Sequence, residues 1–137
     1  MVAIFPSAEW VGDLKDKLNS DEKYAQVARN WEGDLTFDIE PTGDIKERIQ
    51  IYLDLWHGKC RDAHIMKSGE EKDVVFVLNA PYRVFVQILT SQLDPMQAML
   101  TRKLIVKGSL AYMLRNIPTV LDFVRCAQEI TSEHIEA

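Results

Sequence analysis

The chain has 137 residues, 47% of them hydrophobic and 27% charged, which is typical of one globular domain. Its formal net charge is −5 and its basic residues form no run, which disfavours nucleic-acid binding and broad attraction to anionic membranes. No apolar run approaches the roughly 20 residues that span a bilayer, and the first residues do not resemble a signal peptide. We therefore expect a single domain over residues 1–137, located in the cytoplasm.

Two helices are expected to open the chain. Ser7 is a suitable N-cap, and apolar residues follow at helical spacing as far as Leu18. The polar residues 19–22 interrupt this pattern and cap a second helix. Its apolar face includes Tyr24, and it ends near residues 31–33.

Four strands are expected next, because the hydrophobic period changes to two. Alternating apolar and polar residues predict the first three strands. A continuous apolar run predicts the fourth, which we expect to be central and covered on both faces. Hairpin-length connections predict that these four strands are antiparallel. The expected strands cover residues 34–39, 49–55, 61–67 and 74–78.

Two helices, one strand and a final helix complete the prediction. A helix starts at Pro81, because proline suits a first helical turn, and a short helix covers residues 96–100. Residues 104–106 form the last strand. Ser109 can cap the final helix, which Pro118 should kink or split. The fold class is therefore α+β, with helices stacked on one face of a sheet.

The most metal-like group is His57, Cys60 and His64, and two hairpin registers place it differently. One register pairs His57 with Cys60 and puts all three side chains on one face. The other has a three-residue loop that pairs Leu55 with Ala63, sends His64 to the face opposite His57 and leaves Cys60 in the loop. The second register matches the hydrophobic pattern better, so we expect no metal site.

The sequence contains no convincing catalytic group. Cys126 lies on an apolar helix face, where a buried thiol is expected. Asp34, Asp38 and Asp54 are expected on the solvated faces of strands. The six glycines are single and lie at turns, so no phosphate-binding loop is present. We expect no catalytic residue and no cofactor, and therefore no enzyme.

The apolar residues of the second half are more informative. The helix from Pro81, residues 96–100 and the final helix all present large apolar stripes, with Met96, Met99 and Met113 among them. Methionine suits surfaces that fit variable ligands. Periodicity does not distinguish a packed core from a lined cavity, so both interpretations stay open.

One long segment resembles a known family. Ile88–Leu100, in which Asp94-Pro95 starts a helix, is followed by Lys103–Leu110 with its Lys107-Gly108 ending. This combination is similar to the sterol-carrier-protein (non-specific lipid-transfer) family. The hairpin Ile51–Gly58 also resembles the prokaryotic single-domain members, and the element order matches over nearly the whole chain.

Two positions depart from the family pattern. Arg102 stands where the family has a glycine before the strand, and Ser109 stands where an acidic or amide residue is usual. Ser109 still suits a helix cap. Arg102 lies near the expected mouth of a cavity, so the ligand class stays open.

The resemblance implies a five-stranded, mostly antiparallel sheet with helices packed on one face, enclosing an apolar tunnel. Family members bind sterols, fatty acids, acyl-CoA or phospholipids without a cofactor, and no catalytic residue is carried over. The lining implied by the resemblance is Phe85, Ile88, Leu89, Met96, Met99, Leu100, Val106, Leu110, Met113, Leu114 and Leu121.

The expected function is carriage or transfer of such a lipid in a pocket of about 300–1,000 Å³. The alternative is a non-catalytic interaction or oligomerisation module with a filled core. We expect a lipid partner and at most transient membrane contact, and the oligomeric state, a homodimer included, stays open. The final helix, weakened at Pro118, is the expected lid, so truncation beyond Asn116 should release ligand.

Overall fold

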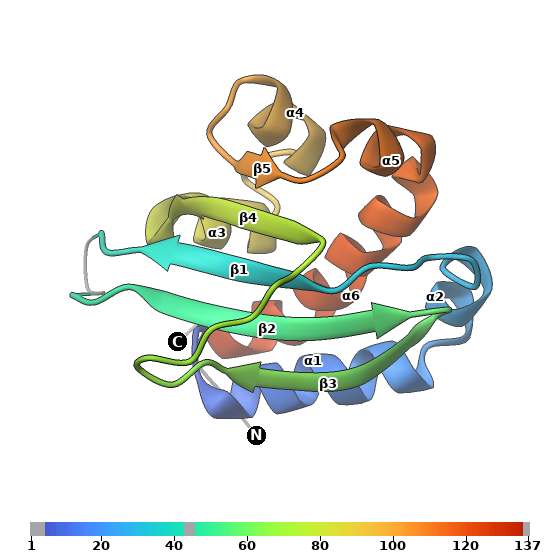
Figure 1. Ribbon diagram of the computed structural model, residues 1–137, viewed down its shortest axis with the longest axis horizontal. Coiled ribbons are helices and arrows are strands. Elements are labelled where there is room, and N and C mark those ends of the chain that lie inside the picture. Colours follow the sequence, from blue (N-terminus) through green and yellow to red (C-terminus); the bar gives the residue numbers. More distant parts are fainter. Residues whose placement is uncertain (1–4, 43–45, 136–137) are drawn as a thin grey trace.

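The structure is a computed structural model that describes residues 5–42 and 46–135 (Figure 1). Five strands form one sheet; in the view of Figure 1, α1, α3 and α6 lie behind it, and α4 and α5 lie above its β4–β5 edge. The elements in chain order are α1 (Ala8–Ser20), α2 (Glu22–Val27), β1 (Leu35–Glu40), β2 (Ile49–Trp56), β3 (Lys59–Ile65), β4 (Phe76–Pro81), α3 (Tyr82–Leu89), α4 (Pro95–Leu100), β5 (Ile105–Lys107), α5 (Leu110–Arg115) and α6 (Ile117–Ile135).

The first helices begin at side-chain caps. The Ser7 hydroxyl accepts a hydrogen bond from the backbone N–H of Trp10, at 3.1 Å, and starts α1 as predicted. Asp21 ends α1 and caps α2 by accepting from the N–H of Tyr24 at 2.9 Å. Trp10 and Leu14 are buried on the face that α1 turns to the core.

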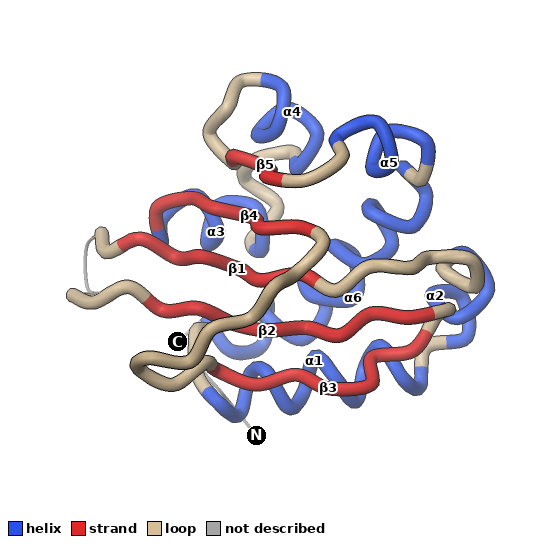
Figure 2. The backbone as a smooth tube through the Cα atoms, in the orientation of Figure 1, coloured by secondary structure: helices blue, strands red, loops and turns tan. Residues whose placement is uncertain are grey.

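The sheet order is β3-β2-β1-β4-β5. The pairs β1–β2, β2–β3 and β4–β5 are antiparallel, and β1–β4 is parallel. The sheet is therefore mostly antiparallel, but the expectation that all of the first four strands are antiparallel is wrong. The connection of residues 66–75 does not close a hairpin. It crosses the front of the sheet and brings β4 beside β1 (Figures 1 and 2).

The middle strand of the sheet is β1, and the apolar run of residues 74–78 overlaps β4, an interior strand between β1 and β5. The observed strand β4 begins at Phe76, two residues later than predicted. Val75 lies in the connection before it and is 51% exposed. Every residue of β1 except Glu40 is buried, including Thr36 and Asp38 on the face away from the helices. On this front face Asp38 lies between Gln50 of β2 and Asn79 of β4 in the register, and it accepts a hydrogen bond from the Asn79 side chain at 3.1 Å.

The three strand-associated aspartates form polar contacts on that front face. Asp38 is buried rather than solvated, and its Oδ1 lies 3.2 Å from Nε of Arg48. Asp34 accepts hydrogen bonds from the Tyr52 hydroxyl and from the backbone N–H of Val75, both at 2.9 Å. Asp34 therefore links β2 to the start of β4. Asp54 is half-buried and pairs with Arg61.

Both sequence-derived registers of the β2–β3 hairpin are wrong. The structure pairs Leu55 with Cys60 and Leu53 with Ala63, with a bulge between these pairs. The turn has two residues, His57 and Gly58, with φ values of 50° and 80°. Two left-handed residues are the geometry of a tight type I′ hairpin turn. The bulge adds one residue to β3. Registers chosen by matching alternating apolar and polar residues on the two strands do not allow for such an extra residue.

Cys60 therefore lies in strand β3, buried in the core, and not in the loop. Gly58 is favoured at the turn by its left-handed backbone conformation and also by the lack of space for a side chain. A Cβ atom there would lie 2.8 Å from the carbonyl oxygen of Ala25. The turn thus packs directly on α2.

Pro118 splits the predicted final helix in two, which is one of the two expected outcomes. Ser109 caps α5 by accepting from the N–H of Tyr112 at 3.1 Å, and Asn116 separates α5 from α6. Pro118 falls in the first turn of α6, where its missing N–H breaks no helical hydrogen bond.

The expectation that the helix beyond Asn116 is a lid is wrong. Helix α6 packs on α1, α2 and α3, and Cys126 and Ala127 are buried in the core. The indole Nε1 of Trp10 donates to the Thr131 hydroxyl at 2.7 Å, and both residues are fully buried. Truncation at Asn116 would remove a wall of the core, so it would unfold the domain rather than open it.

Candidate ligand cavity

A cavity of about 80 Å³ lies between the sheet and the helices, and its surface is entirely apolar. Strands β1, β2 and β4 supply one wall, and α3, α4 and α6 supply most of the others. This volume is below the 300–1,000 Å³ expected for a ligand pocket, so that expectation is wrong for this conformation. The cavity as it stands would not hold a whole acyl chain.

The structure brings five of the eleven sequence-predicted lining residues to the cavity wall. They come from three short helices and are Phe85, Ile88, Leu89, Met99 and Met113. The other six are not part of this wall. Met96 and Val106 are half-buried, and four leucines are exposed at the surface, namely Leu100, Leu110, Leu114 and Leu121.

Leu110 and Leu114 lie outside this wall because α5 has apolar residues on two faces. On α5, Met113 is buried against the cavity while Leu110 and Leu114, one turn apart, face outward. Hydrophobicity alone does not tell which of these faces points to the core. Only the docking of α5 on the domain decides it.

Thirteen lining residues were not among the predicted set. The strand residues could have been found, because Leu35 and Phe37 alternate with polar residues on the inner face of β1. The α6 residues also had a signal, since they recur at helical spacing. The thirteen are Tyr24, Trp31, Leu35, Phe37, Leu55, Leu78, Pro95, Leu104, Thr119, Val120, Phe123, Val124 and Ala127.

Two polar groups of the wall are already bonded to backbone carbonyls. The Thr119 hydroxyl donates to the carbonyl of Val27 at 2.9 Å. The Trp31 indole donates to the carbonyl of Gly33 at 2.9 Å. These bonds leave the cavity surface apolar, so its contribution to binding is burial of hydrocarbon rather than polar recognition.

The predicted metal-like residues are held by separate partners. Nε2 of His57 lies 2.7 Å from Glu32 at the hairpin turn. Nε2 of His64 lies 2.8 Å from Glu70 on the front face. Burial raises the pKa of the Cys60 thiol to about 12, so the thiol is protonated near neutral pH.

A different group, Asp21, Asp122 and Cys126, has ligand-type atoms within 4.8 Å of one another. Its centre is already occupied by the guanidinium of Arg125, which donates to Asp21 at 2.6 Å and to Asp122 at 2.8 Å. Burial raises the pKa of the Cys126 thiol to about 11, which disfavours the thiolate that a metal would need. The arrangement works as an ion-pair network between α2 and α6.

No helix within residues 5–42 and 46–135 is long and apolar enough to cross a bilayer. The fold and the cavity together define a class of protein. This chain is an α+β domain with a mixed sheet covered by helices on one face and an apolar cavity between the two layers.

The chain belongs to the SCP-2 sterol transfer family, whose profile matches residues 12–120. Two solved structures of similar sequence support this assignment. A crystal structure of sterol carrier protein 2 shares 30% identity and a TM-score of 0.80, covering 90% of this chain and 96% of that one. A conserved hypothetical protein from Thermus thermophilus shares 28% identity and a TM-score of 0.81, covering 95% and 91%.

A third structure shows the same fold at lower identity. It is sterol carrier protein 2 from Aedes aegypti in complex with the C16 fatty acid palmitate, at 18% identity and a TM-score of 0.55. It covers 86% of this chain and 93% of its own. A search of the curated proteins found no match. The recognition made from residues 88–110 is therefore confirmed at the level of family and fold.

Proposed function

We propose that this protein binds one single-chain lipid, of the fatty-acid class, in the cavity and carries it, without transforming it. The observation that supports this most directly is the wholly apolar surface of the cavity. A fatty acid fits this chemistry because most of its surface is hydrocarbon. The Aedes aegypti neighbour of the same fold, which holds palmitate, supports the same ligand class.

The energetics of such a ligand are favourable. Burying ten methylenes would contribute about 8 kcal/mol, at about 0.8 kcal/mol each. Loss of ligand freedom and ordering of side chains would offset several kcal/mol. A Kd of about 1 μM, which corresponds to about −8 kcal/mol, is therefore the tightest binding expected for ten buried methylenes.

Binding requires the cavity to expand from about 80 Å³. The part of the wall best suited to move is formed by α4 and α5, because each has only six residues. Helices this short are marginal unless tertiary packing holds them. We expect the opening there, and not in α6, which packs on three other helices.

A second candidate follows from the same small volume. If the cavity never expands, the domain is a filled-core interaction module that binds no lipid. Only the carrier predicts that wild-type protein binds lipid and that a substitution filling the cavity weakens this binding.

The testing substitution is Ala127→Leu, on the buried wall contributed by α6. In a carrier, three added heavy atoms occupy ligand space, so fatty-acid binding should fall at least ten-fold while the protein stays folded. Binding is measured by isothermal titration with palmitate, and bound lipid by native mass spectrometry. The matched control is Ala8→Leu on the exposed face of α1, which should bind as wild type.

Wild-type protein that neither co-purifies with lipid nor binds added palmitate would reject the carrier proposal in favour of the filled-core module. Equal palmitate affinity in wild type and in a folded Ala127→Leu variant would also reject this cavity as the site. The proposed compartment is the cytoplasm, and the two free, buried cysteines fit a reducing environment.

A further inference from the structure

Residues 95–121 differ from the rest of the chain in charge. This segment contains four basic residues and no aspartate or glutamate, whereas the remaining residues contain twelve basic and all twenty-one acidic ones. The four basic side chains are exposed, and none forms an ion pair with a described residue. An acidic protein therefore has one locally cationic region. Its basic residues are Arg102, Lys103, Lys107 and Arg115.

The same segment holds four of the six large hydrophobic residues that are exposed among the described residues. Exposed leucines gathered in one segment are a stronger signal than leucines scattered singly. We call the four basic residues and these leucines together the cationic leucine surface. The leucines are Leu100 (70% exposed), Leu110 (45%), Leu114 (43%) and Leu121 (41%).

Three of these leucines directly follow a residue of the cavity wall in the chain. Met99, Met113 and Val120 line the cavity. Their next residues, Leu100, Leu114 and Leu121, are exposed to the outside. The cationic leucine surface and the cavity are thus two sides of a wall one helix thick.

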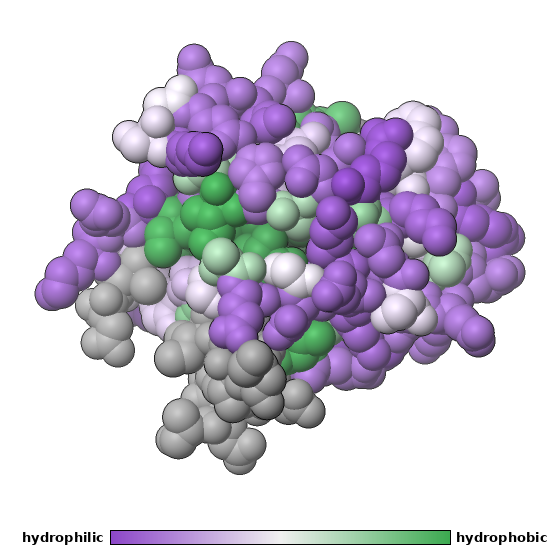
Figure 3. Space-filling model, turned by 90° about the horizontal axis from the view of Figure 1, so that it is seen from below, coloured by the Kyte–Doolittle hydropathy of each residue, from purple (hydrophilic) through white to green (hydrophobic). Residues whose placement is uncertain are grey.

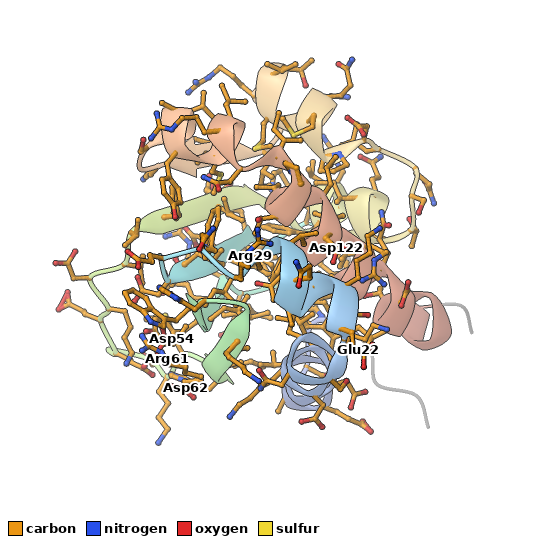
Figure 4. The ribbon with its side chains drawn as sticks, turned by 90° about the vertical axis from the view of Figure 1, so that its right-hand side faces the viewer. Glu22, Arg29, Asp54, Arg61, Asp62 and Asp122 are labelled. Carbon is orange, nitrogen blue, oxygen red and sulfur yellow. The ribbon has the colours of Figure 1, made fainter. Side chains whose placement is uncertain are left out.

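The elements of this wall lie together in space. Figures 1 and 4 both place α4, β5 and α5 at one end of the molecule. The opposite end, seen from below in Figure 3, is largely hydrophilic, with a hydrophobic area among polar side chains. The cationic leucine surface is therefore concentrated at one end.

A polar cleft of about 530 Å³ opens beside this surface. Arg83, Arg102 and Lys103 line it, and Glu40 is the acidic side chain among its described lining. Arg102 has a φ of 61°, a left-handed conformation that favours glycine. The chain thus places an exposed guanidinium at a backbone position where glycine would be easier.

We propose that the cationic leucine surface docks on an anionic lipid bilayer. The leucines enter the interfacial layer, the basic side chains contact lipid phosphates, and lipid passes between the bilayer and the cavity through the wall of α4 and α5. The transfer step rests on the proposed function, whereas docking on the bilayer is tested independently of it. Each basic residue near an anionic membrane surface adds about five-fold to affinity, so local charge outweighs the net charge of −5.

Charge also decides between a bilayer and a second copy of the chain. A symmetric dimer would bring this surface against itself and place the same four unpaired cations face to face. Like charges across an interface are unfavourable, whereas phosphates neutralise them. The bilayer is therefore the occupant that the surface fits.

The test is flotation of the purified protein with vesicles of phosphatidylcholine containing 30% phosphatidylglycerol, compared with pure phosphatidylcholine. Wild type should float with the anionic vesicles only, and binding should weaken in high salt. The variant Lys103→Gln/Lys107→Gln should bind about 25-fold more weakly, at about five-fold for each lysine. The control Lys59→Gln/Lys67→Gln also removes two exposed, unpaired lysines, on the hairpin side, and should float as wild type.

Two further variants separate the contributions of leucine and arginine. Leu110→Ser/Leu114→Ser should abolish the binding that remains in high salt, because that part is hydrophobic. Arg102→Gly should raise the melting temperature, because glycine relaxes the left-handed position, and still lower vesicle affinity about five-fold. A gain in stability with a loss of docking excludes misfolding as the cause.

Failure of wild type to float with anionic vesicles would overturn the proposal, as would equal losses in the lysine variant and its control. A wild-type dimer that Leu110→Ser/Leu114→Ser dissociates, without any vesicle binding, would assign the surface to a second copy instead. Palmitate titration without vesicles tests the cavity separately, and Lys103→Gln/Lys107→Gln should leave that affinity unchanged. If wild-type protein floats with anionic vesicles but does not bind palmitate, the carrier function alone is rejected.

Discussion

Arg125 is the residue on which the contact between α2 and α6 depends most. Its guanidinium donates to Asp122, to Asp21 and to Glu129, and Asp122 is buried. The hydrogen bond from Arg125 holds the pKa of Asp21 well below its usual range. Asp21 also caps α2 and pairs with Lys17 at 3.2 Å. One arginine thus supports a helix start, a helix–helix contact and a buried carboxylate.

The variant Arg125→Met should therefore lower stability at pH 7 by about 1–3 kcal/mol, because Asp122 is left with a weaker partner. The sign of the pH dependence follows from Asp21. Its pKa is lower in the folded than in the unfolded state, so its stabilisation is present above about pH 4 and is lost as pH falls further. Urea unfolding at pH 7 and pH 3 should show a smaller loss for Arg125→Met than for wild type.

Arg61→Met is the control for this prediction. Arg61 pairs with Asp54 at 3.0 Å, but its side chain is 53% exposed. Figure 4 shows Arg61 beside Asp54 and Asp62, away from Asp122. An exposed pair is screened by solvent, so little change in stability is expected. Equal effects of the two substitutions would show that Arg125 is no more important than a surface arginine.

Among the elements, the helices differ in length and in the contacts that hold them. Helices α1 and α6 are long and packed against each other through the buried pair Trp10 and Thr131. Helices α4 and α5 have six residues each, and each exposes leucine outward. Local opening is easiest where few buried contacts hold an element. We therefore expect the cavity wall formed by α4 and α5 to open more readily than the wall formed by α6.

Hydrogen exchange should show this difference. Backbone amides of α4 and α5 should exchange at least ten-fold faster than those in the middle of α6, and palmitate should slow them. The length-matched control is α2, which also has six residues but is held by the buried Tyr24 and by Asp21. Exchange of α4 and α5 as slow as that of α2 would contradict a movable wall.

For the molecule as a whole, binding inside the fold can be measured as stabilisation, because a ligand that binds only the folded protein raises its free energy of unfolding. Palmitate at 100 times its Kd should stabilise the folded protein by about 2.7 kcal/mol. For a domain of this size that corresponds to a rise in melting temperature of roughly 10 °C. Scanning calorimetry of wild type and Ala127→Leu should show the rise in wild type only. Palmitate that binds wild type without raising its melting temperature would not bind inside the fold.

The element order, the α+β class and the family could all be predicted from the amino-acid sequence. These features depend on local signals. Ser7 and Ser109 cap helices through their own hydroxyls, Pro118 cannot continue a helix, and periodicity separates helices from strands. Phe85, Ile88 and Leu89 of the cavity wall were also predictable, because they lie on the single apolar stripe of α3.

Where those elements meet depends on the folded domain. The connection of residues 66–75 could close a hairpin or cross the sheet, and its crossing pairs β4 in parallel with β1 and makes β1 the middle strand. The bulge in β3 changes the register by one residue without a composition signal. Helix α5 has apolar residues on two faces, so docking alone assigns Met113 to the cavity and Leu114 to the outside. In each case the deciding contact joins residues far apart in the chain, and local patterns contain no information about it.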